Sequence, residues 1–343
     1  MKTSFEYFYF ETNKILVDSS GSFFPSDWAP VISGTPQGTI LGPILFLSYI
    51  NDIVDSVSSK IQLFTDDTKI YRELRNPSLD ERCLQTDLNN LGKWAKIWQL
   101  RFNEGKCEAM RITHSRDKSN TNYKLGMVLK DVKSFKDLGI PISKDLTWSE
   151  HISTIVNKAN QVLGLIRRTV GTANTTTFSL LYKTLVTPLL EYAAPVWNPY
   201  LVKDIHAIES VQRRASRLAL RQKRGDMSYE ERCDMLHWPS LSSRRTYFSL
   251  VECFKIVFGL SYMANHSYKL YCKLSRLNCF KYSFFNNVIS HWNDLPRNVI
   301  EAGSLDLFKC RLKSFLKFQI LLFVFFLGEL TSRLSLSNLC SYI

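Results

Sequence analysis

Leu63-Phe64-Thr65-Asp66-Asp67-Thr68-Lys69 is the stretch of sequence that most restricts the fold. Residues 61–65 and 68–71, on either side of the acidic pair, are rich in β-branched and aromatic residues. They predict two short strands joined at Asp66-Asp67. An Asp-Asp pair is a poor sequence for a two-residue turn, which favours Asn-Gly or Asp-Gly. Two adjacent like charges at a hairpin tip therefore need an explanation other than turn propensity.

Adjacent carboxylates are candidate ligands for Mg²⁺, which prefers hard oxygen donors and keeps positions open for water and phosphate. Two such ions would clamp the attacking and leaving oxygens of a phosphoryl transfer. Successive side chains on a strand point to opposite faces, so Asp66 and Asp67 reach the same ion only if the turn breaks that alternation. A third carboxylate from another strand is expected. The alternative is an exposed turn with no ligand.

A segment punctuated by glycine and proline precedes the hairpin: Ser-Gly-Thr-Pro-Gln-Gly-Thr-Ile-Leu-Gly-Pro at residues 33–43. An apolar run at residues 44–50 follows it directly. This order predicts a loop that feeds a buried helix ending near Asn51-Asp52, with Pro43 in the first turn. The loop lacks the Gly-Lys-Ser/Thr of a phosphate-binding P-loop. Its alternatives are backbone contacts to an anion or base, and a plain helix entry.

Two Ser/Thr-x-x-Glu patterns, at residues 78–81 and 147–150, predict capping boxes at helix starts. Amphipathic spacing follows each of them, to about residue 101 and to Gly171, and the pattern stays helical to about residue 260. Residues 107–143 between the two helices predict short strands, with turns at 124–126 and 137–141. The expected fold class is therefore α+β, mixed at first and helical after about residue 144.

Size and composition fit a globular protein of about two domains, since the chain has 343 residues and 45% hydrophobic residues. The net charge of +13 favours polyanionic partners, nucleic acid first. The 8 cysteines are scattered without a C-x-x-C pair, which predicts reduced thiols in an intracellular protein, with nucleus and cytoplasm both open. The longest apolar run, residues 320–327, is too short to span a bilayer, so no membrane association is expected.

Basic residues gather in residues 151–225, which hold eleven Lys or Arg and only three acidic residues. Their densest run predicts a nucleic-acid-binding surface and consists of Arg213, Arg214, Arg217, Arg221, Lys223 and Arg224. A cation that meets a phosphate releases a counterion, so such binding would weaken steeply with salt. The alternative is a solvated helix face, on which long basic side chains are common.

In combination, residues 33–53 and the stretch Leu-Phe-Thr-Asp-Asp-Thr-Lys resemble the reverse transcriptases of non-LTR (LINE-type) retrotransposons. Further motifs continue the resemblance in the same order, from about residue 15 to residue 316. They are Trp94, Trp98, Phe102-Asn103 and Lys106-Cys107, then Phe135-Lys136-Asp137-Leu138-Gly139-Ile140, Leu146-Thr147-Trp148 with His151-Ile152, Trp292-Asn293-Asp294-Leu295-Pro296 and Ser304-Leu305-Asp306-Leu307-Phe308-Lys309.

The resemblance implies a division of the chain into polymerase parts. Residues 1–143 would form a partial palm, an antiparallel sheet with helices. Residues 144–260 would form a helical thumb that includes the basic nucleic-acid-binding region. Residues 261–318 would form a C-terminal region, and residues 319–343 are an apolar tail that resembles nothing in the family.

The resemblance also implies roles for single residues. Asp66 and Asp67 would be catalytic residues and ligands of Mg²⁺, and Pro36-Gln37-Gly38 would line the pocket for nucleotide and template. Lys106 would act as the acid toward the leaving pyrophosphate; the alternative for it is a surface lysine at a strand start. The expected partners are an RNA template, a DNA primer and deoxynucleoside triphosphates.

Two departures from the family pattern bear on activity. Thr65 stands where the family usually has Ala. The family's first metal-binding Asp and its fingers lie many tens of residues before the Pro-Gln-Gly loop, whereas here 35 residues precede Pro36, with Asp18 and Asp27 as their aspartates. We therefore expect an RNA-directed DNA polymerase that is truncated at its N-terminus and inactive alone. The alternatives are a non-catalytic nucleic-acid-binding remnant, and an unstable remnant that aggregates through an exposed sheet edge.

Overall fold

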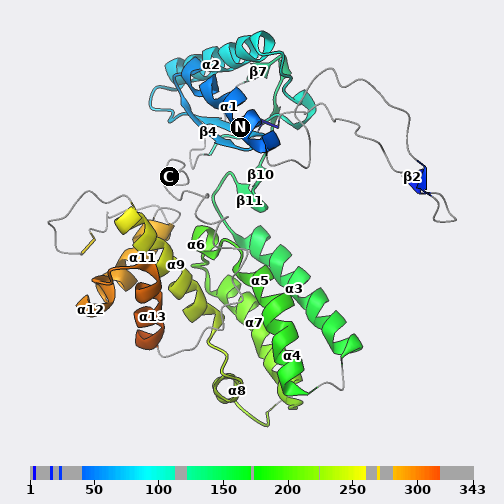
Figure 1. Ribbon diagram of the computed structural model, residues 1–343, viewed down its shortest axis with the longest axis vertical. Helices are drawn as coiled ribbons and strands as arrows, with labels where there is room; N and C mark the ends of the chain where they lie inside the picture. The colour runs from blue at the N-terminus through cyan, green and yellow to red at the C-terminus, as the bar shows by residue number, and fades with distance from the viewer. Residues whose placement is uncertain are drawn as a thin grey trace. The chain divides into compact units, whose positions relative to one another are not determined.

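The computed structural model describes residues 3–4, 16–17, 23–24, 41–112, 122–170, 174–223, 225–259, 269–270 and 281–316. The chain divides into two compact units, Met1–Asp145 and Leu146–Ile343. The first unit mixes helices with small sheets and the second is helical, which is compatible with the predicted α+β class (Figure 1). None of the described helices combines the length and the apolar character needed to cross a membrane.

A three-stranded sheet lies at the centre of the first unit. Its strands run in the order β1-β5-β4, and β5 is antiparallel to both neighbours. The elements of this unit are β1 (Thr3–Ser4), β2 (Leu16–Val17), β3 (Phe23–Phe24), α1 (Leu41–Ile50), the 3₁₀ helix η1 (Asn51–Ser56), β4 (Lys60–Phe64), β5 (Asp67–Tyr71), α2 (Pro77–Ile97), the 3₁₀ turn η2 (Glu104–Lys106), β6 (Glu108–Ala109), β7 (Lys124–Leu125), β8 (Met127–Val128), β9 (Lys130–Asp131), β10 (Ser134–Asp137) and β11 (Ile140–Ser143).

The described residues of the first unit also form four two-stranded sheets: β2 with β3, β7 with β8, β10 with β11, and the parallel pair β6 with β9. The short strands expected in residues 107–143 are present. Their turns fall at Gly126 (φ 77°) and at Leu138-Gly139 (φ 44° and 90°), near the predicted positions. Glycine is favoured at these positions because it adopts positive φ without steric cost.

The core of the first unit lies between the sheet and the helices α1 and α2 (Figure 1). Its buried apolar side chains are Phe46, Ile50, Ile53, Ile70, Leu88, Leu91, Trp94, Ala95, Cys107, Ala109, Leu125 and Leu129. α2 contributes through a stripe at helical spacing, and β5 contributes Ile70. The strand that carries Asp67 is therefore anchored directly in this core.

The apolar run after the glycine-rich loop forms α1, as predicted, but the prediction that this helix is buried is wrong. Phe46 and Ile50 face the core. The exposed fraction of Leu41 is 64%, and Ile44, Leu45, Leu47 and Tyr49 are also exposed. A helix packed on one side buries only one stripe of its surface, so the remaining apolar residues stay uncovered by the described part of the chain.

The predicted cap at Ser78 is also corrected. The N-cap is Asn76, two residues earlier than predicted, and α2 begins at Pro77. Proline is favourable at the first helical position because its missing N–H has no helical partner there anyway. The backbone N–H of Asn76 donates to Oδ2 of Asp80 at 2.8 Å. This hydrogen bond, together with the ion pair to Arg72, holds the pKa of Asp80 below its ordinary value.

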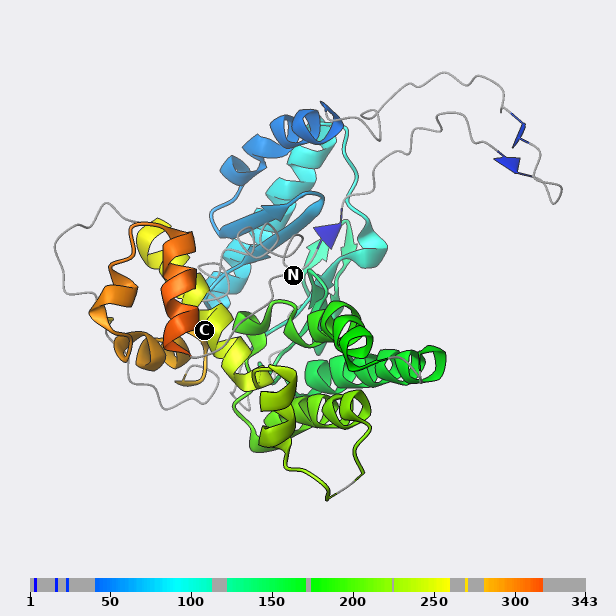
Figure 2. The same cartoon turned by 60° about the horizontal axis from the view of Figure 1, so that its bottom comes forward.

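The second unit is built around the parallel helices α3 and α7, which lie side by side (Figure 1). α11 and α13 pack against α9 in a separate apolar cluster (Figure 2). The elements are α3 (Ser149–Thr169), α4 (Thr175–Leu181), the π-helical turn η3 (Tyr182–Val186), α5 (Thr187–Glu191), α6 (Ala194–Trp197), α7 (Val202–Leu220), α8 (Tyr229–Leu236), α9 (Leu241–Gly259), α11 (Phe284–Asn293), α12 (Arg297–Ile300) and α13 (Leu305–Phe315).

Capping in the second unit differs from the prediction as well. α3 begins at Ser149 with Trp148 as its N-cap, so the predicted box at Thr147 is not the cap of this helix. A complete capping box, with both reciprocal bonds, forms instead between Ser228 and Glu231 at the start of α8. The sequence analysis missed it because α8 has only 8 residues and lacks a long amphipathic stripe.

Burial of His151 makes the second unit sensitive to acid. The ring lies 5.1 Å from that of Trp197, its Nε2 has no hydrogen-bond partner among the described residues, and burial lowers its pKa to about 4. Because the unfolded chain takes up this proton near pH 6.5, stability is complete above that pH and falls between pH 6.5 and 4. We expect the free energy of unfolding to fall by about 1–2 kcal/mol from pH 7.5 to pH 5.

The measurement is urea unfolding of the second unit at the two pH values, followed by Trp fluorescence. His151→Gln should reduce the pH dependence. His206→Gln, at an exposed position of α7, should leave it unchanged. An unchanged pH dependence in the His151 variant would refute the assignment.

Candidate functional site

The hairpin β4–β5 presents the acidic pair, but its turn is one residue earlier than predicted. Phe64 lies opposite Asp67, so the two turn residues are Thr65 and Asp66, and Asp67 is the first residue of β5. Thr65 has a φ of 50°, in the left-handed region that β-branched residues rarely adopt. Its hydroxyl lies within hydrogen-bonding distance of Phe64 O (2.7 Å) and of Asp66 Oδ1 (3.0 Å). The turn therefore breaks the strand alternation between the two carboxylates.

Both aspartates are partly exposed at the end of the sheet. Ser4 of β1 lies opposite Asp67 on the other side of β5, so Asp67 belongs to the central strand and Asp66 to the tip. By donor type the pair fits a Mg²⁺ ion, which takes six oxygen ligands, usually with one or two carboxylates. Within the described residues no group of three or more His, Cys, Asp or Glu side chains is placed to hold a metal ion. The third carboxylate expected from the sequence is thus not found in this part of the chain.

Lys106 lies near the hairpin through β1. The strand β1 pairs with β5 at Asp67 and also contacts η2, the turn that ends at Lys106. Lys106 is exposed, and its backbone N–H donates to Asn103 O at 3.0 Å. The fold therefore brings the turn of Lys106 next to β1, the strand that pairs with β5 at Asp67. Pro36, Gln37 and Gly38 lie outside the described residues.

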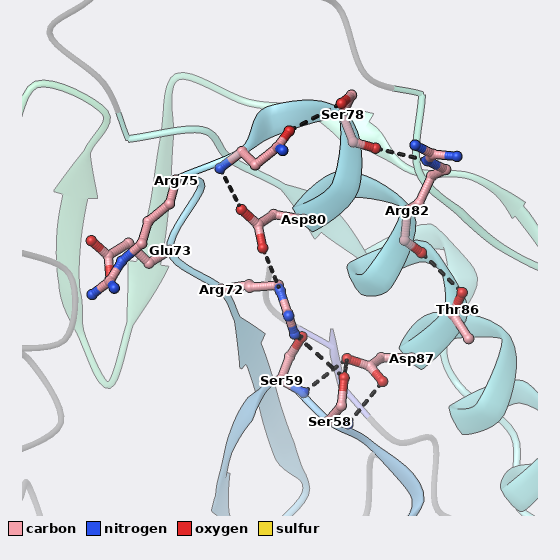
Figure 3. A network of polar contacts seen from close by, with 11 residues as sticks. Ser58, Ser59, Arg72, Glu73, Arg75, Ser78, Asp80, Arg82, Thr86 and Asp87 are labelled. Atoms are coloured by element: carbon pink, nitrogen blue, oxygen red, sulfur yellow. Dashed lines mark hydrogen bonds and ion pairs between the residues drawn. The ribbon is translucent and has the colours of Figure 1, made fainter.

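A buried carboxylate on α2 fixes the start of the hairpin (Figure 3). Asp87 is 2% exposed. Its Oδ1 accepts the Ser58 N–H and its Oδ2 the Ser59 N–H, both at 2.8 Å, immediately before β4. Arg72, at the end of β5, reaches the hydroxyls of both serines and also pairs with Asp80. Both ends of the hairpin are therefore tied to α2.

A second buried contact ties the hairpin to β10. Nζ of Lys69 in β5 lies 2.5 Å from Oδ1 of Asp137, and both side chains are 8% exposed. Lys69 and Asp137 lie in stretches that carry the family resemblance, but the sequence analysis gave neither residue a role of its own, and it gave none to Asp87. The available signal for Asp87 was its place on the apolar stripe of α2, between Leu84 and Leu91. Spacing alone gave no signal for the Lys69–Asp137 pair.

In the second unit, the acids of the basic segment turn inward. Glu191 forms an ion pair with Arg244, with Nη2 and Oε2 2.7 Å apart. The Ser149 hydroxyl donates to Oδ2 of Asp204 at 2.7 Å, and Asp204 is 8% exposed. These two carboxylates are paired inside the unit, so they do not neutralise the cations on its surface.

The third acid, Glu209, is also buried. It accepts hydrogen bonds from the Tyr229 hydroxyl and from the Ser242 N–H, both at 2.8 Å. Burial, and then the charge of Glu209, raise the pKa of Tyr229, so its hydroxyl stays protonated and donates. All three acids counted in residues 151–225 are therefore withdrawn from the surface, which makes that surface more positive than the composition indicates.

The basic surface itself is carried by α3, α7 and the segment after α7. Its exposed cations are Lys158, Arg167, Arg168, Lys203, Arg213, Arg214, Arg221 and Lys223. Arg217 is half-buried, and Arg224 lies outside the described residues. We call this set, with Arg217, the α3–α7 basic surface.

Arg213 and Arg214 diverge on α7. The Arg213 guanidinium lies over the Tyr229 ring, 5.1 Å from its centroid, whereas Arg214 donates to Oδ1 of Asn160 on α3 at 3.0 Å. Arg214, Arg217 and Arg221 follow one another at helical spacing, so they form one row beside α3. These contacts hold the side chains in place without removing their charge.

Comparison with known proteins identifies the class of the first unit. Residues 3–142, which contain the hairpin, match the reverse transcriptase (RNA-dependent DNA polymerase) family. The resemblance predicted from the motifs is confirmed: residues 3–142 match this family, and the chain is similar to the RNA-directed DNA polymerases of non-LTR mobile elements.

Similar proteins come from Drosophila mobile elements. The chain is 23% identical, over 57% of its length, to 22% of the RNA-directed DNA polymerase from mobile element jockey of Drosophila melanogaster. It is 24% identical, over 55% of its length, to 22% of the probable RNA-directed DNA polymerase from transposon X-element of the same species. The chain thus spans about a fifth of the length of these relatives. No solved structure matches. Both relatives are named as polymerases, which gives no support to a non-catalytic remnant.

Proposed function

We propose that this chain carries the catalytic hairpin of an RNA-directed DNA polymerase, with a palm formed by residues 1–143 and a thumb by residues 144–260. The observation that supports this most is the position of Asp66 and Asp67 at the end of β4–β5, inside the segment that matches the family. The C-terminal region, residues 261–318, and the tail, residues 319–343, follow the thumb in this proposal.

In the proposed reaction the primer 3′-hydroxyl attacks the α-phosphate of a deoxynucleoside triphosphate, and pyrophosphate leaves. Mg²⁺, when bound, supplies the positive charge that stabilises the phosphoryl transfer. Asp66 and Asp67 hold the ion, and Pro36-Gln37-Gly38 line the nucleotide pocket. Lys106 donates a proton toward the departing pyrophosphate oxygen, a role that suits an exposed lysine on the turn next to β1.

The α3–α7 basic surface binds the template and primer in this proposal. Phosphate contacts position a nucleic acid without reading its sequence, which suits a polymerase that copies many sequences. RNA and DNA are its partners inside the cell in this proposal.

Because the described residues place two carboxylates at this site and not the third that the sequence analysis expects, we also propose that this chain alone has little polymerase activity. The test has two readouts on the same proteins. In the first, Fe²⁺ replaces Mg²⁺, and peroxide with ascorbate cleaves the backbone close to the bound ion. We expect cleavage near residues 66–67, suppressed by excess Mg²⁺ and absent from Asp66→Asn/Asp67→Asn. The control Asp55→Asn/Asp131→Asn changes two exposed acids of the same unit and should cleave like the wild type.

The second readout is extension of a DNA primer on an RNA template. The wild-type chain should stay near the level of the double variant. Robust synthesis that depends on Asp66 would contradict the proposal of low activity but support the polymerase site. Cleavage that persists unchanged in the double variant would refute the proposed site itself.

A further inference from the structure

The buried ion pair between Lys69 and Asp137 lies close to the acidic tip and is not part of it. The two side chains come from β5 and from β10, which are 68 positions apart in the sequence and belong to different sheets. Oδ1 of Asp137 has no hydrogen bond of ordinary geometry among the described residues, so the charge of Lys69 compensates its burial. A buried carboxylate needs such a partner.

Lys69 is two residues after Asp67 on the same strand. Side chains two apart on a strand point to the same face, with their Cα atoms roughly 7 Å apart. The flexible four-carbon side chain of Lys69 can therefore reach either carboxylate. In the structure its ammonium is directed to Asp137.

The β10–β11 hairpin holds Asp137 rigidly. Asp137 lies opposite Ile140, next to the two-residue turn formed by Leu138 and Gly139. Phe135 and Ile142, opposite each other in the hairpin, are both buried. The carboxylate is therefore fixed by a packed, fully paired element rather than by a free loop.

We propose that Asp137 is a positioning residue that keeps the Lys69 ammonium away from Asp67, so that the acidic tip keeps its negative charge for a metal cation. The inference rests on the proposed function, in which Asp66 and Asp67 hold the ion. Without the Asp137 charge, the Lys69 ammonium would pair with Asp67 and compete with the cation for the same oxygens.

The test measures Mn²⁺ affinity from the electron paramagnetic resonance signal of free Mn²⁺. Asp137→Asn keeps the shape of the side chain and removes its charge, and we expect about 10-fold weaker Mn²⁺ binding. In Lys69→Met/Asp137→Asn the competing ammonium is absent, so binding should return to the wild-type level although the tie between β5 and β10 is lost. A purely structural role predicts that the double variant binds as weakly as the single variant or more weakly.

Equal affinity of the wild type and Asp137→Asn would overturn the inference, and so would a double variant that stays weak. If Asp137→Asn does not fold, Lys69→Met alone decides: binding at least as tight as in the wild type supports the inference, and weaker binding refutes it. The variant Asp66→Asn/Asp67→Asn distinguishes a failure of the proposed metal site from a failure of the proposed role of Asp137. If that variant still binds Mn²⁺ normally, the proposed site is wrong; if it loses Mn²⁺ while Asp137→Asn does not, only the role of Asp137 is wrong.

Discussion

Replacing Arg213, Arg214 and Arg217 with Ala is expected to weaken the binding of an RNA–DNA hybrid by on the order of 10²-fold at 150 mM salt. Each cation that neutralises a phosphate contributes about 0.9 to the slope of log affinity against log salt concentration. Removing three contacts should therefore reduce that slope by about 3. Within residues 151–225 the remaining positive charge is not offset by acids, because Glu191, Asp204 and Glu209 are all paired inside the unit.

Fluorescence anisotropy of a labelled hybrid, titrated between 50 and 300 mM salt, measures both the affinity and the slope. The control Lys93→Ala/Lys96→Ala/Arg101→Ala removes the same charge from three exposed positions of the first unit and should change binding far less. Lys at the three arginine positions should preserve the slope, since a phosphate contact needs the charge. A thermal melt checks the fold, because Arg213 also packs on Tyr229. Unchanged affinity in the alanine variant would refute this surface.

The hairpin was predictable from the sequence because its signal is local. Alternating β-branched and aromatic residues on both sides of Asp66-Asp67 specify two strands, and β4 and β5 follow them. The position of the turn was not predictable from propensity, since it lies at Thr65-Asp66 with a threonine in the left-handed region. The register of the hairpin is fixed by the pairing of β5 with β1 and by the packing of β5 against the core. Both constraints come from distant parts of the chain.

The basic surface was predictable in sign but not in strength. Composition gave eleven cations against three acids in residues 151–225. It could not show that Asp204 and Glu209 lie on the buried face of α7, among residues such as Gln212 and Ser216 that are also polar. A helix whose buried face carries polar residues does not show a simple apolar stripe, so its orientation had to come from the structure.

The contacts that support the hairpin could not be derived from motifs. Lys69–Asp137 and Asp87–Ser58 join residues that are far apart in the sequence. Asp87 had a signal in its place on the apolar stripe of α2, but the burial of Lys69 and Asp137 and the partners of all three side chains became visible only in the fold. The first unit thus depends on buried carboxylates whose pairing the motif pattern did not indicate.

Asp87→Ala should therefore be the most damaging single change in the first unit. It leaves the N–H groups of Ser58 and Ser59, which donate to this carboxylate at 2.8 Å, without their acceptor. A buried donor that loses its partner costs about 1–3 kcal/mol, more when the partner is charged, so we expect a loss of about 3–5 kcal/mol. That is a large fraction of the stability of a small domain.

Hydrogen exchange measured by mass spectrometry on peptides that cover β4 and β5 is the direct test, since the lost bonds lie just before β4. A loss of about 3 kcal/mol corresponds to exchange faster by on the order of 10²-fold in this hairpin. Asp87→Asn keeps one acceptor oxygen and should lose less. Thr86→Ala, one residue away on the exposed face of α2, removes only a bond to Arg82 O of the same helix and should change exchange little (Figure 3). If Asp87→Ala and Thr86→Ala exchange alike, Asp87 does not hold the hairpin, and the acidic tip owes its position to the apolar core alone.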